Sequence, residues 1–253
     1  MAQYESHVIC TSPRSGSTLL CKLLAATGVA GNPESYFHRP SIADWFSDLD
    51  LAHDPTIPER ELLAAMFQAV IAKGSLDAGI FALRLQRHSF NFFIDKLAVL
   101  HPGRSNDVER FRAAFGRTLF VHLTRRNKVE QAVSYVKARQ TGLWHASPGG
   151  TELERLSAPQ EPVYDADEIQ ARLTEITDDD RGWERWFSAS EIEPLRITYE
   201  ELSADPAKAL RLVLDPLGLH SQAADEVTPG TAKLADDINR DWVERFQSER
   251  HTR

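Results

Sequence analysis

The stretch Val8-Ile9-Cys10-Thr11-Ser12-Pro13-Arg14-Ser15-Gly16-Ser17-Thr18-Leu19-Leu20 decides the fold. It begins as a short apolar run, which is typical of a buried strand, and breaks at Ser12-Pro13. An apolar helical pattern resumes at Leu19. A strand, a tight polar loop and a helix N-terminus together predict an anion site, because the first N–H groups of a helix have no partner inside it and its dipole favours negative charge.

The loop also has the side chains that an anion needs. Gly16 lets the backbone approach a ligand closely, and Arg14 adds a fixed positive charge. Three hydroxyls, those of Ser15, Ser17 and Thr18, add donors. The alternative is an ordinary strand-to-helix turn with a Ser or Thr cap, which needs neither the arginine nor so many hydroxyls.

Length and charge limit the class of protein. The chain has 253 residues, 42% of them hydrophobic, which favours one large domain with a sizeable core. Its formal net charge is -8, which argues against general nucleic-acid binding but leaves room for a local basic pocket. The two cysteines, Cys10 and Cys21, lie in apolar contexts without CxxC spacing, so we expect buried thiols in a reducing compartment and no zinc site.

The sequence also lacks the patterns of a membrane span and of a signal peptide. No apolar run approaches the roughly 18 residues of a membrane span. Residues 1–6 lack the basic region of a signal peptide. We therefore expect a cytoplasmic protein.

A second anion site is predicted further along the chain. The run 119–124 is nearly continuously apolar, as in a central parallel strand, and it leads into Arg125-Arg126-Asn127 and then a helical pattern. Two arginines at a strand's end, before a helix N-terminus, can bind an anion, and Ser134 on that helix could reach the same ligand. Alone, the pair is equally well explained as a solvated basic turn. Two such sites on successive strand-to-helix turns are harder to dismiss.

Strand and helix patterns alternate over the rest of the chain. Further strands are predicted at 79–85 and 194–199, and helices at 59–73, 90–100, 166–189 and 207–214. This alternation predicts an α/β fold with a mainly parallel sheet. Residues 145–165 are rich in Ser, Pro, Gly and Glu and predict a long mobile loop. The acidic run Asp178-Asp179-Asp180 is interpreted as a solvated helix face rather than a metal site.

Familiar phosphate chemistry does not fit the first loop. A nucleoside triphosphatase needs a lysine after the glycine, and here Ser17 and Thr18 follow Gly16 directly. A strand ending in a magnesium-binding Asp is missing too, and Cys10 stands too close to Arg14 for a phosphatase loop. An arginine-based anion cradle that needs no metal remains.

These residues resemble a known family. The segment 12–20 looks like the 5′-phosphosulfate loop of sulfotransferases that use 3′-phosphoadenosine 5′-phosphosulfate (PAPS), and 125–134 resembles their 3′-phosphate site. Ordered pieces along the chain resemble the bacterial trehalose 2-sulfotransferase family more narrowly; they are residues 26–31, 36–37, 182–187, 192–194 and 241–246.

The resemblance implies a P-loop-like three-layer fold, with a central, mainly parallel sheet flanked by helices, over the whole of 1–253. It implies PAPS as donor, a hydroxyl of a carbohydrate or glycolipid as acceptor, no metal, and a homodimer. The amides of Ser15 to Thr18 would hold the 5′-phosphosulfate, with Arg14 on the transferring group and Arg84 assisting. Arg125 and Ser134 would hold the 3′-phosphate, with Arg126 as the alternative arginine.

One departure from the family concerns the general base. The family has a Glu directly before the aromatic pair that Tyr36-Phe37 matches, but here Ser35 stands there and Glu34 comes one residue earlier. We expect Glu34 to be the base, with His38 as the alternative, because an imidazole suits proton transfer near neutral pH. The shift leaves open a nucleotide sensor without turnover. A magnesium-dependent phosphotransferase is the other alternative.

Overall fold

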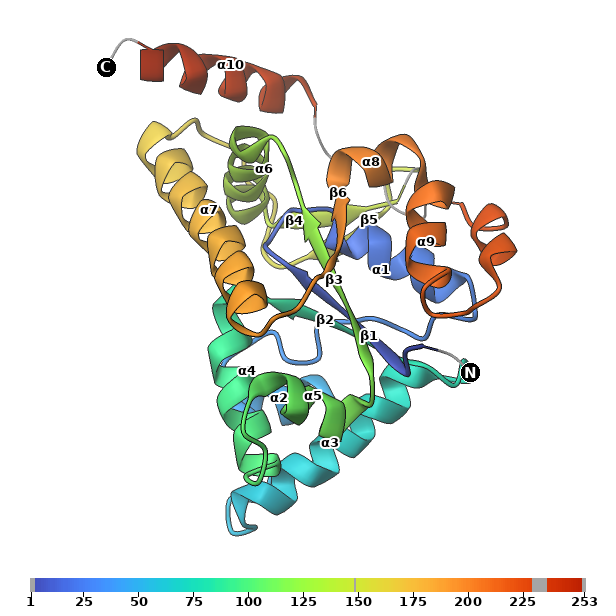
Figure 1. Cartoon of the computed structure of the whole chain (residues 1–253). Helices are drawn as coiled ribbons and strands as arrows, with labels where there is room; N and C mark the ends of the chain where they lie inside the picture. The colour runs from blue at the N-terminus through green and yellow to red at the C-terminus, as the bar shows by residue number, and fades with distance from the viewer. Residues whose placement is uncertain (1–2, 148, 229–235, 252–253) are drawn as a thin grey trace.

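A parallel sheet forms the centre of the molecule. The computed structural model describes residues 3–147, 149–228 and 236–251. Within them, one sheet has the strand order β2-β1-β3-β6, and every neighbouring pair is parallel. Its strands are β1 (Ser6–Thr11), β2 (Phe81–Gln86), β3 (Thr118–Thr124) and β6 (Leu195–Thr198). The predicted α/β fold with a mainly parallel sheet is therefore confirmed (Figure 1).

Helices surround this sheet. They are α1 (Ser17–Ala26), α2 (Ile42–Asp48), α3 (Glu59–Ser75), α4 (Arg87–Leu100), α5 (Asp107–Phe115), α6 (Lys128–Thr141), α7 (Ala166–Ala189), α8 (Tyr199–Ala204), α9 (Pro206–Leu214), the short 3-10 helix η1 (Ser221–Asp225) and α10 (Asp237–His251). The last strand, predicted at 194–199, is too long by one residue at each end. Tyr199 begins α8 because Thr198 and Glu201 form a reciprocal capping box that starts a helix there.

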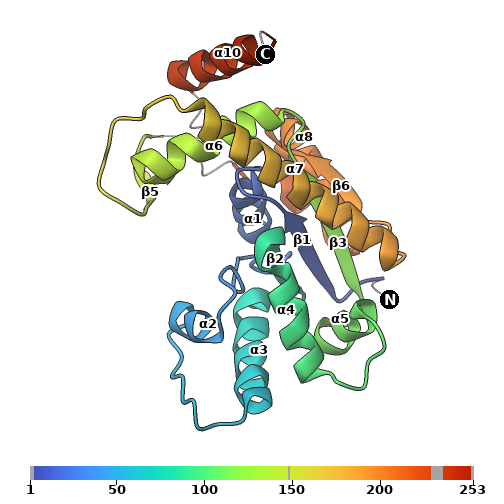
Figure 2. The ribbon, with the colours of Figure 1, turned by 90° about the vertical axis from the view of Figure 1, so that its left-hand side faces the viewer.

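Alternating strand residues supply two different cores. On one face of the sheet, Val8 and Leu83 pack with α3, α4 and α5, in a cluster rich in phenylalanine. On the other face, Ile9 and Val121 pack with α1 and α9. Successive side chains of a strand point to opposite faces, so β1 is buried on both sides and serves as the centre of a three-layer arrangement. Figure 2 shows these layers from the side.

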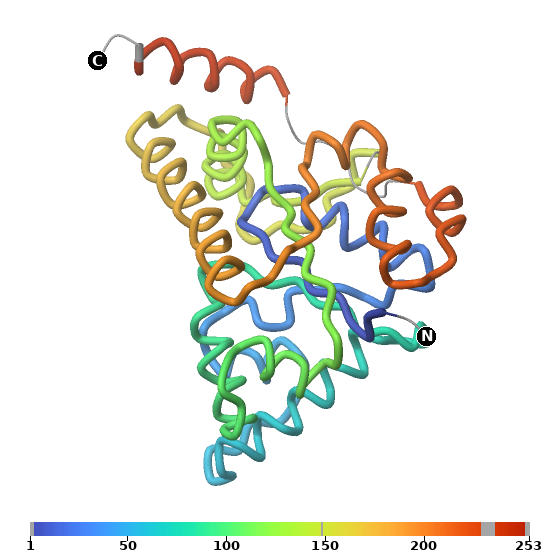
Figure 3. Tube along the Cα trace, in the orientation of Figure 1, coloured from blue at the N-terminus to red at the C-terminus, as the bar shows by residue number. Residues whose placement is uncertain are grey.

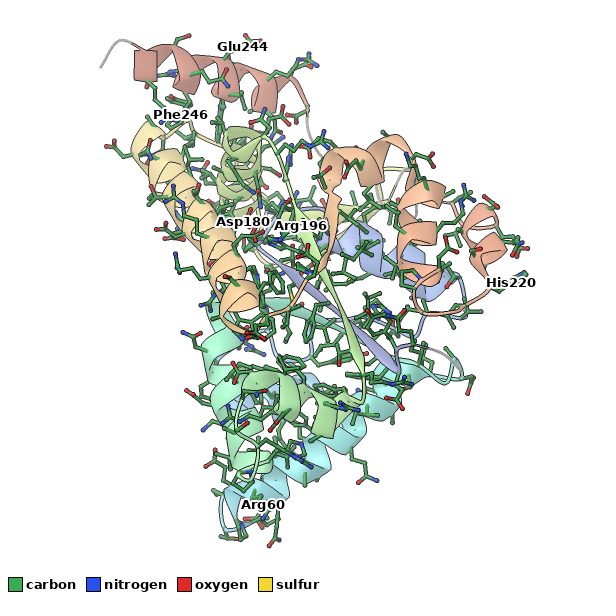
Figure 4. The ribbon with its side chains drawn as sticks, viewed as in Figure 1. Arg60, Asp180, Arg196, His220, Glu244 and Phe246 are labelled. Atoms are coloured by element: carbon green, nitrogen blue, oxygen red, sulfur yellow. The ribbon has the colours of Figure 1, made fainter. Side chains whose placement is uncertain are left out.

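A third cluster lies beyond the carboxyl edge of the sheet, where α6, α7 and α10 pack together. Phe246 lies on the side of α10 that faces α6 and α7, and Glu244 lies on the opposite side (Figure 4). Helix α7 is also fixed to the sheet, because the indole Nε1 of Trp183 donates to the Thr11 carbonyl over 2.8 Å.

Part of the predicted loop 145–165 has regular structure. Strands β4 (Leu143–Ala146) and β5 (Glu152–Arg155) form an antiparallel hairpin, and irregular chain follows it up to α7. In Figure 3 the path of this hairpin can be followed past the N-terminal end of α1. The hairpin thus lies beside the loop with which the sequence analysis began.

Candidate active site

The first anion site lies where β1 ends and α1 begins. Arg14 has a φ of 62° and Gly16, the N-cap of α1, a φ of 86°. A Cβ added at Gly16 would stand 2.4 Å from Cδ2 of Tyr199. Only glycine fits there, for a steric as well as a conformational reason. The loop therefore brings backbone against the ring of Tyr199 and opens α1 with Ser17 and Thr18.

The three hydroxyls of this loop have different surroundings. The Ser15 hydroxyl is fully buried and bonds to Thr11 Oγ1, so its side chain turns away from the proposed ligand. The hydroxyls of Ser17 and Thr18 both accept from Nη1 of Arg84, over 3.3 and 2.9 Å. These two hydrogen bonds bring Arg84 of β2 to the first turn of α1.

The second anion site follows β3. Arg125 is only 6% exposed, and its Nη2 donates to Glu130 over 2.6 Å. Its guanidinium lies 4.8 Å from the ring centre of Tyr199, and its buried Nε has no hydrogen-bond partner among the described residues. A buried arginine with a free donor can still bind an anion.

The two sites are in direct contact. Nε of Arg14 donates to Ser134 Oγ on α6 over 3.0 Å, and its Nη1 donates to the Trp144 carbonyl on β4 over 2.6 Å. Burial, followed by the nearby charge of Arg125, lowers the pKa of Arg14 to about 10, so Arg14 is charged at neutral pH. An anion between these like charges would relieve their repulsion.

One cavity of about 950 Å³ joins these groups. Of the residues predicted to act, the following line it: Arg14, Gly16, Ser17, Thr18, His38, Arg84, Arg125 and Ser134. Ser15, Glu34 and Arg126 lie outside the set of described residues that line it.

Arg126 has a different environment from Arg125. Its side chain is 62% exposed, its Nη2 donates to Glu201 over 2.7 Å, and it lines only the smaller cavity, which Arg125 borders as well. Of the two neighbouring arginines at the end of β3, Arg125 is therefore buried and Arg126 is exposed.

The two candidate bases also differ in position. Glu34 is exposed, and its carbonyl accepts the backbone N–H of Arg84 over 3.1 Å. Ser35, its neighbour, lines the cavity and accepts from Arg84 Nε over 2.7 Å. His38 lines the cavity too, and burial, assisted by His88, lowers its pKa to about 4, so its imidazole is neutral at pH 7.

The sequence analysis missed several residues of this cavity. From the hairpin come Trp144, His145 and Glu154, and from α8 comes Tyr199. No spacing rule could have found the hairpin residues, because they contact residues about 130 positions away.

The acidic run on α7 was expected to be a solvated helix face; Asp178 is exposed, but Asp179 and Asp180 are partly buried. Asp179 lines the cavity, and burial raises its pKa to about 6. Asp180 accepts from Ser12 over 2.9 Å and pairs with Lys128. Helix α7 carries these carboxylates toward the sheet because Trp183, on the same helix, is bound to β1.

Among the described residues, His, Cys, Asp and Glu side chains form no group of three or more that could hold a metal ion. None of the helices in the described ranges has the length and apolar character to cross a membrane.

Fold and site together define an α/β protein with a cavity at the carboxyl edge of its sheet, in which Arg14 is hydrogen-bonded to Ser134 and Arg125 lies close by. The family model of the Stf0 sulphotransferases matches residues 6–249, and the chain belongs to that family. The resemblance found in the sequence analysis is thus confirmed.

Relatives of known function support the same family. The chain is 29% identical to the trehalose 2-sulfotransferase of Mycobacterium tuberculosis (strain ATCC 35801 / TMC 107 / Erdman) and 28% identical to that of Mycolicibacterium smegmatis (strain ATCC 700084 / mc(2)155). Each comparison covers 96% of this chain and 94% of the relative. Among solved structures, the sulfotransferase domain of the Synechococcus PCC 7002 olefin synthase is 17% identical, with a TM-score of 0.43 over 98% of this chain and 89% of that one.

Proposed function

We propose that this sulfotransferase moves a sulfuryl group from PAPS to a hydroxyl of a carbohydrate acceptor. The observation that carries the proposal is the hydrogen bond from Arg14 to Ser134, which joins two anion sites inside one cavity. Such a cavity suits a nucleotide with an anion at each end. The trehalose 2-sulfotransferases among its relatives favour a sugar as acceptor.

The residues divide into two groups around the donor. The N–H groups that open α1 would hold the 5′-phosphosulfate, with Arg14 and Arg84 placing positive charge beside the transferring group. Arg125 and Ser134 would hold the 3′-phosphate. Arg125 is preferred to Arg126 because it lines the same cavity as Arg14 and Ser134, whereas Arg126 does not.

For proton transfer we propose His38 in preference to Glu34. His38 lines the cavity and is neutral at pH 7, so it can accept the proton of an acceptor hydroxyl as that oxygen attacks sulfur. Glu34 is not among the described residues that line the cavity.

The test is transfer of ³⁵S-labelled sulfate from PAPS to a panel of sugars that includes trehalose. Transfer should occur without added magnesium and be lost in Arg14→Ala, and Arg126→Ala serves as the matched arginine outside the cavity. Binding of 3′,5′-adenosine diphosphate without transfer to any acceptor would favour the nucleotide sensor. An absolute magnesium requirement would favour the phosphotransferase.

A further inference from the structure

The β4–β5 hairpin places an imidazole against the donor loop. Nε2 of His145 lies 3.1 Å from Thr18 Oγ1 and 3.4 Å from Oε2 of Glu154. The side chain of His145 is 25% exposed and lines the same cavity as Arg14. The proposed reaction gives this histidine no role, although it touches the first turn of α1.

The hydrogen bonds around Thr18 indicate that Nε2 of His145 is an acceptor when no ligand is bound. Thr18 Oγ1 accepts a hydrogen bond from Nη1 of Arg84, so its own hydroxyl proton can be donated to Nε2 of His145. The ring is then an acceptor, which is the wrong polarity beside a bound anion. It must gain a proton or move when an anion fills the loop.

The charges that face the ring come from four segments. They are Arg14 of the loop, Lys22 of α1, Arg84 of β2 and Glu154 of β5. Burial, followed by the three cations, lowers the pKa of His145 to about 4, so the ring is neutral at pH 7. A bound phosphate or sulfate group would offset those cations and favour the charged imidazole.

We propose that His145 is an additional donor-binding residue, which takes up a proton from solvent when an anion occupies the loop and then donates a hydrogen bond to that anion. Glu154 pairs with the imidazolium once it forms. The inference rests on the proposed function only for the identity of the anion, which is the 5′-phosphate end of the nucleotide.

The sign of the effect follows from linkage. A group whose pKa is higher in the complex makes binding tighter as the pH falls, between its pKa in the free protein and its pKa in the complex. Phosphates of the ligand also titrate, with a pKa near 6. The informative quantity is therefore the difference between the wild-type chain and His145→Gln.

The experiment is calorimetric titration with 3′,5′-adenosine diphosphate, at several pH values and in two buffers of different ionisation enthalpy. Wild type should take up more protons on binding than His145→Gln, and its affinity should exceed that of the variant about tenfold at pH 6.5 and by less at pH 8.5. Glu154→Gln should lie between the two. His220→Gln changes an exposed histidine that lines neither described cavity, and this variant should keep the wild-type excess of protons.

Histidine NMR of the wild-type chain gives a second readout that needs the variant only for assignment. The His145 signals should titrate at a higher pH with the ligand than without it. Equal proton uptake by wild type and His145→Gln, or an unchanged His145 titration, would overturn the inference and leave the proposed function standing. Failure of wild type to bind the nucleotide at all would overturn both.

Discussion

At the scale of single residues, the site depends on close packing between Gly16, Tyr199 and Arg125. Gly16 has no room for a Cβ because of Tyr199, and Tyr199 in turn lies beneath the guanidinium of Arg125. A change at Gly16 would therefore disturb both anion sites through one aromatic ring.

Gly16→Ala should lower the affinity for 3′,5′-adenosine diphosphate at least tenfold. A positive φ alone costs an alanine about 1–2 kcal/mol, and the clash with Tyr199 adds to that cost. Gly28→Ala is the matched control, since Gly28 has a φ of 70° with nothing within 4 Å of the added Cβ. Titration calorimetry and unfolding of both variants check this, and equal behaviour of the two would contradict it.

Arg125→Gln should weaken binding of the same nucleotide by about 10- to 100-fold, since a hydrogen bond to a charged group contributes about 1.5–3 kcal/mol. Arg126→Gln should change it less than about fivefold, because Arg126 forms an exposed ion pair. Arg125→Lys separates the loss of charge from the loss of geometry. A larger loss for Arg126→Gln would assign the 3′-phosphate to the other arginine.

At the scale of elements, the sequence predicted the strand, loop and helix of residues 8–20, because each has a local signal: apolar run, turn residues and helical periodicity. The hairpin has none. Its second strand, Glu152–Arg155, is mostly exposed and carries charge at three of four positions, so no apolar alternation marks it. Its role is visible only through contacts of Trp144 and His145 with residues of the distant loop.

The hairpin should depend on Gly142. This residue has a φ of 72°, and a Cβ there would stand 2.6 Å from the backbone oxygen of Ser157. Gly142→Ala should increase hydrogen exchange of 143–157 and weaken nucleotide binding, because the contacts to Arg14 and Thr18 would shift. Gly150→Ala, with a φ of 83° and open space, is the control. The same exchange measurement tests the mobility expected for residues 145–165.

At the scale of the whole molecule, the sheet supports the site from below and α7 supports it from the side. The bonds from Trp183 to Thr11 and from Ser12 to Asp180 span more than half of the chain. Local patterns predicted α7 as an amphipathic helix, yet no local pattern could say that it packs against the end of β1. The family resemblance placed the motifs in order along the chain, but the contacts between α7 and the end of β1 are visible only in the folded structure.

Stability should fall in mild acid because of His7. This histidine is fully buried on β1, donates from Nε2 to the Ala30 carbonyl over 2.8 Å, and burial lowers its pKa to about 4. The unfolded chain binds the extra proton first, so this contribution is complete above pH 6.5 and is lost as the pH falls toward 4, by up to about 3 kcal/mol. Urea unfolding from pH 4.5 to 8 should show a smaller slope for His7→Gln, and identical slopes would refute the assignment.

The bond between Arg14 and Ser134 has a consequence for selectivity among the nucleotides of a cell. ATP and similar compounds carry all their phosphate at the 5′ end, so they could fill the loop but would leave the second site, at Arg125 and Ser134, without a ligand anion. Arg125 would then keep only its ion pair with Glu130, whereas a nucleotide with an anion at each end would give that charge a second partner. We therefore expect the cavity to select a nucleotide by the spacing of its two anions rather than by its total charge, so that excess ATP competes poorly with the donor.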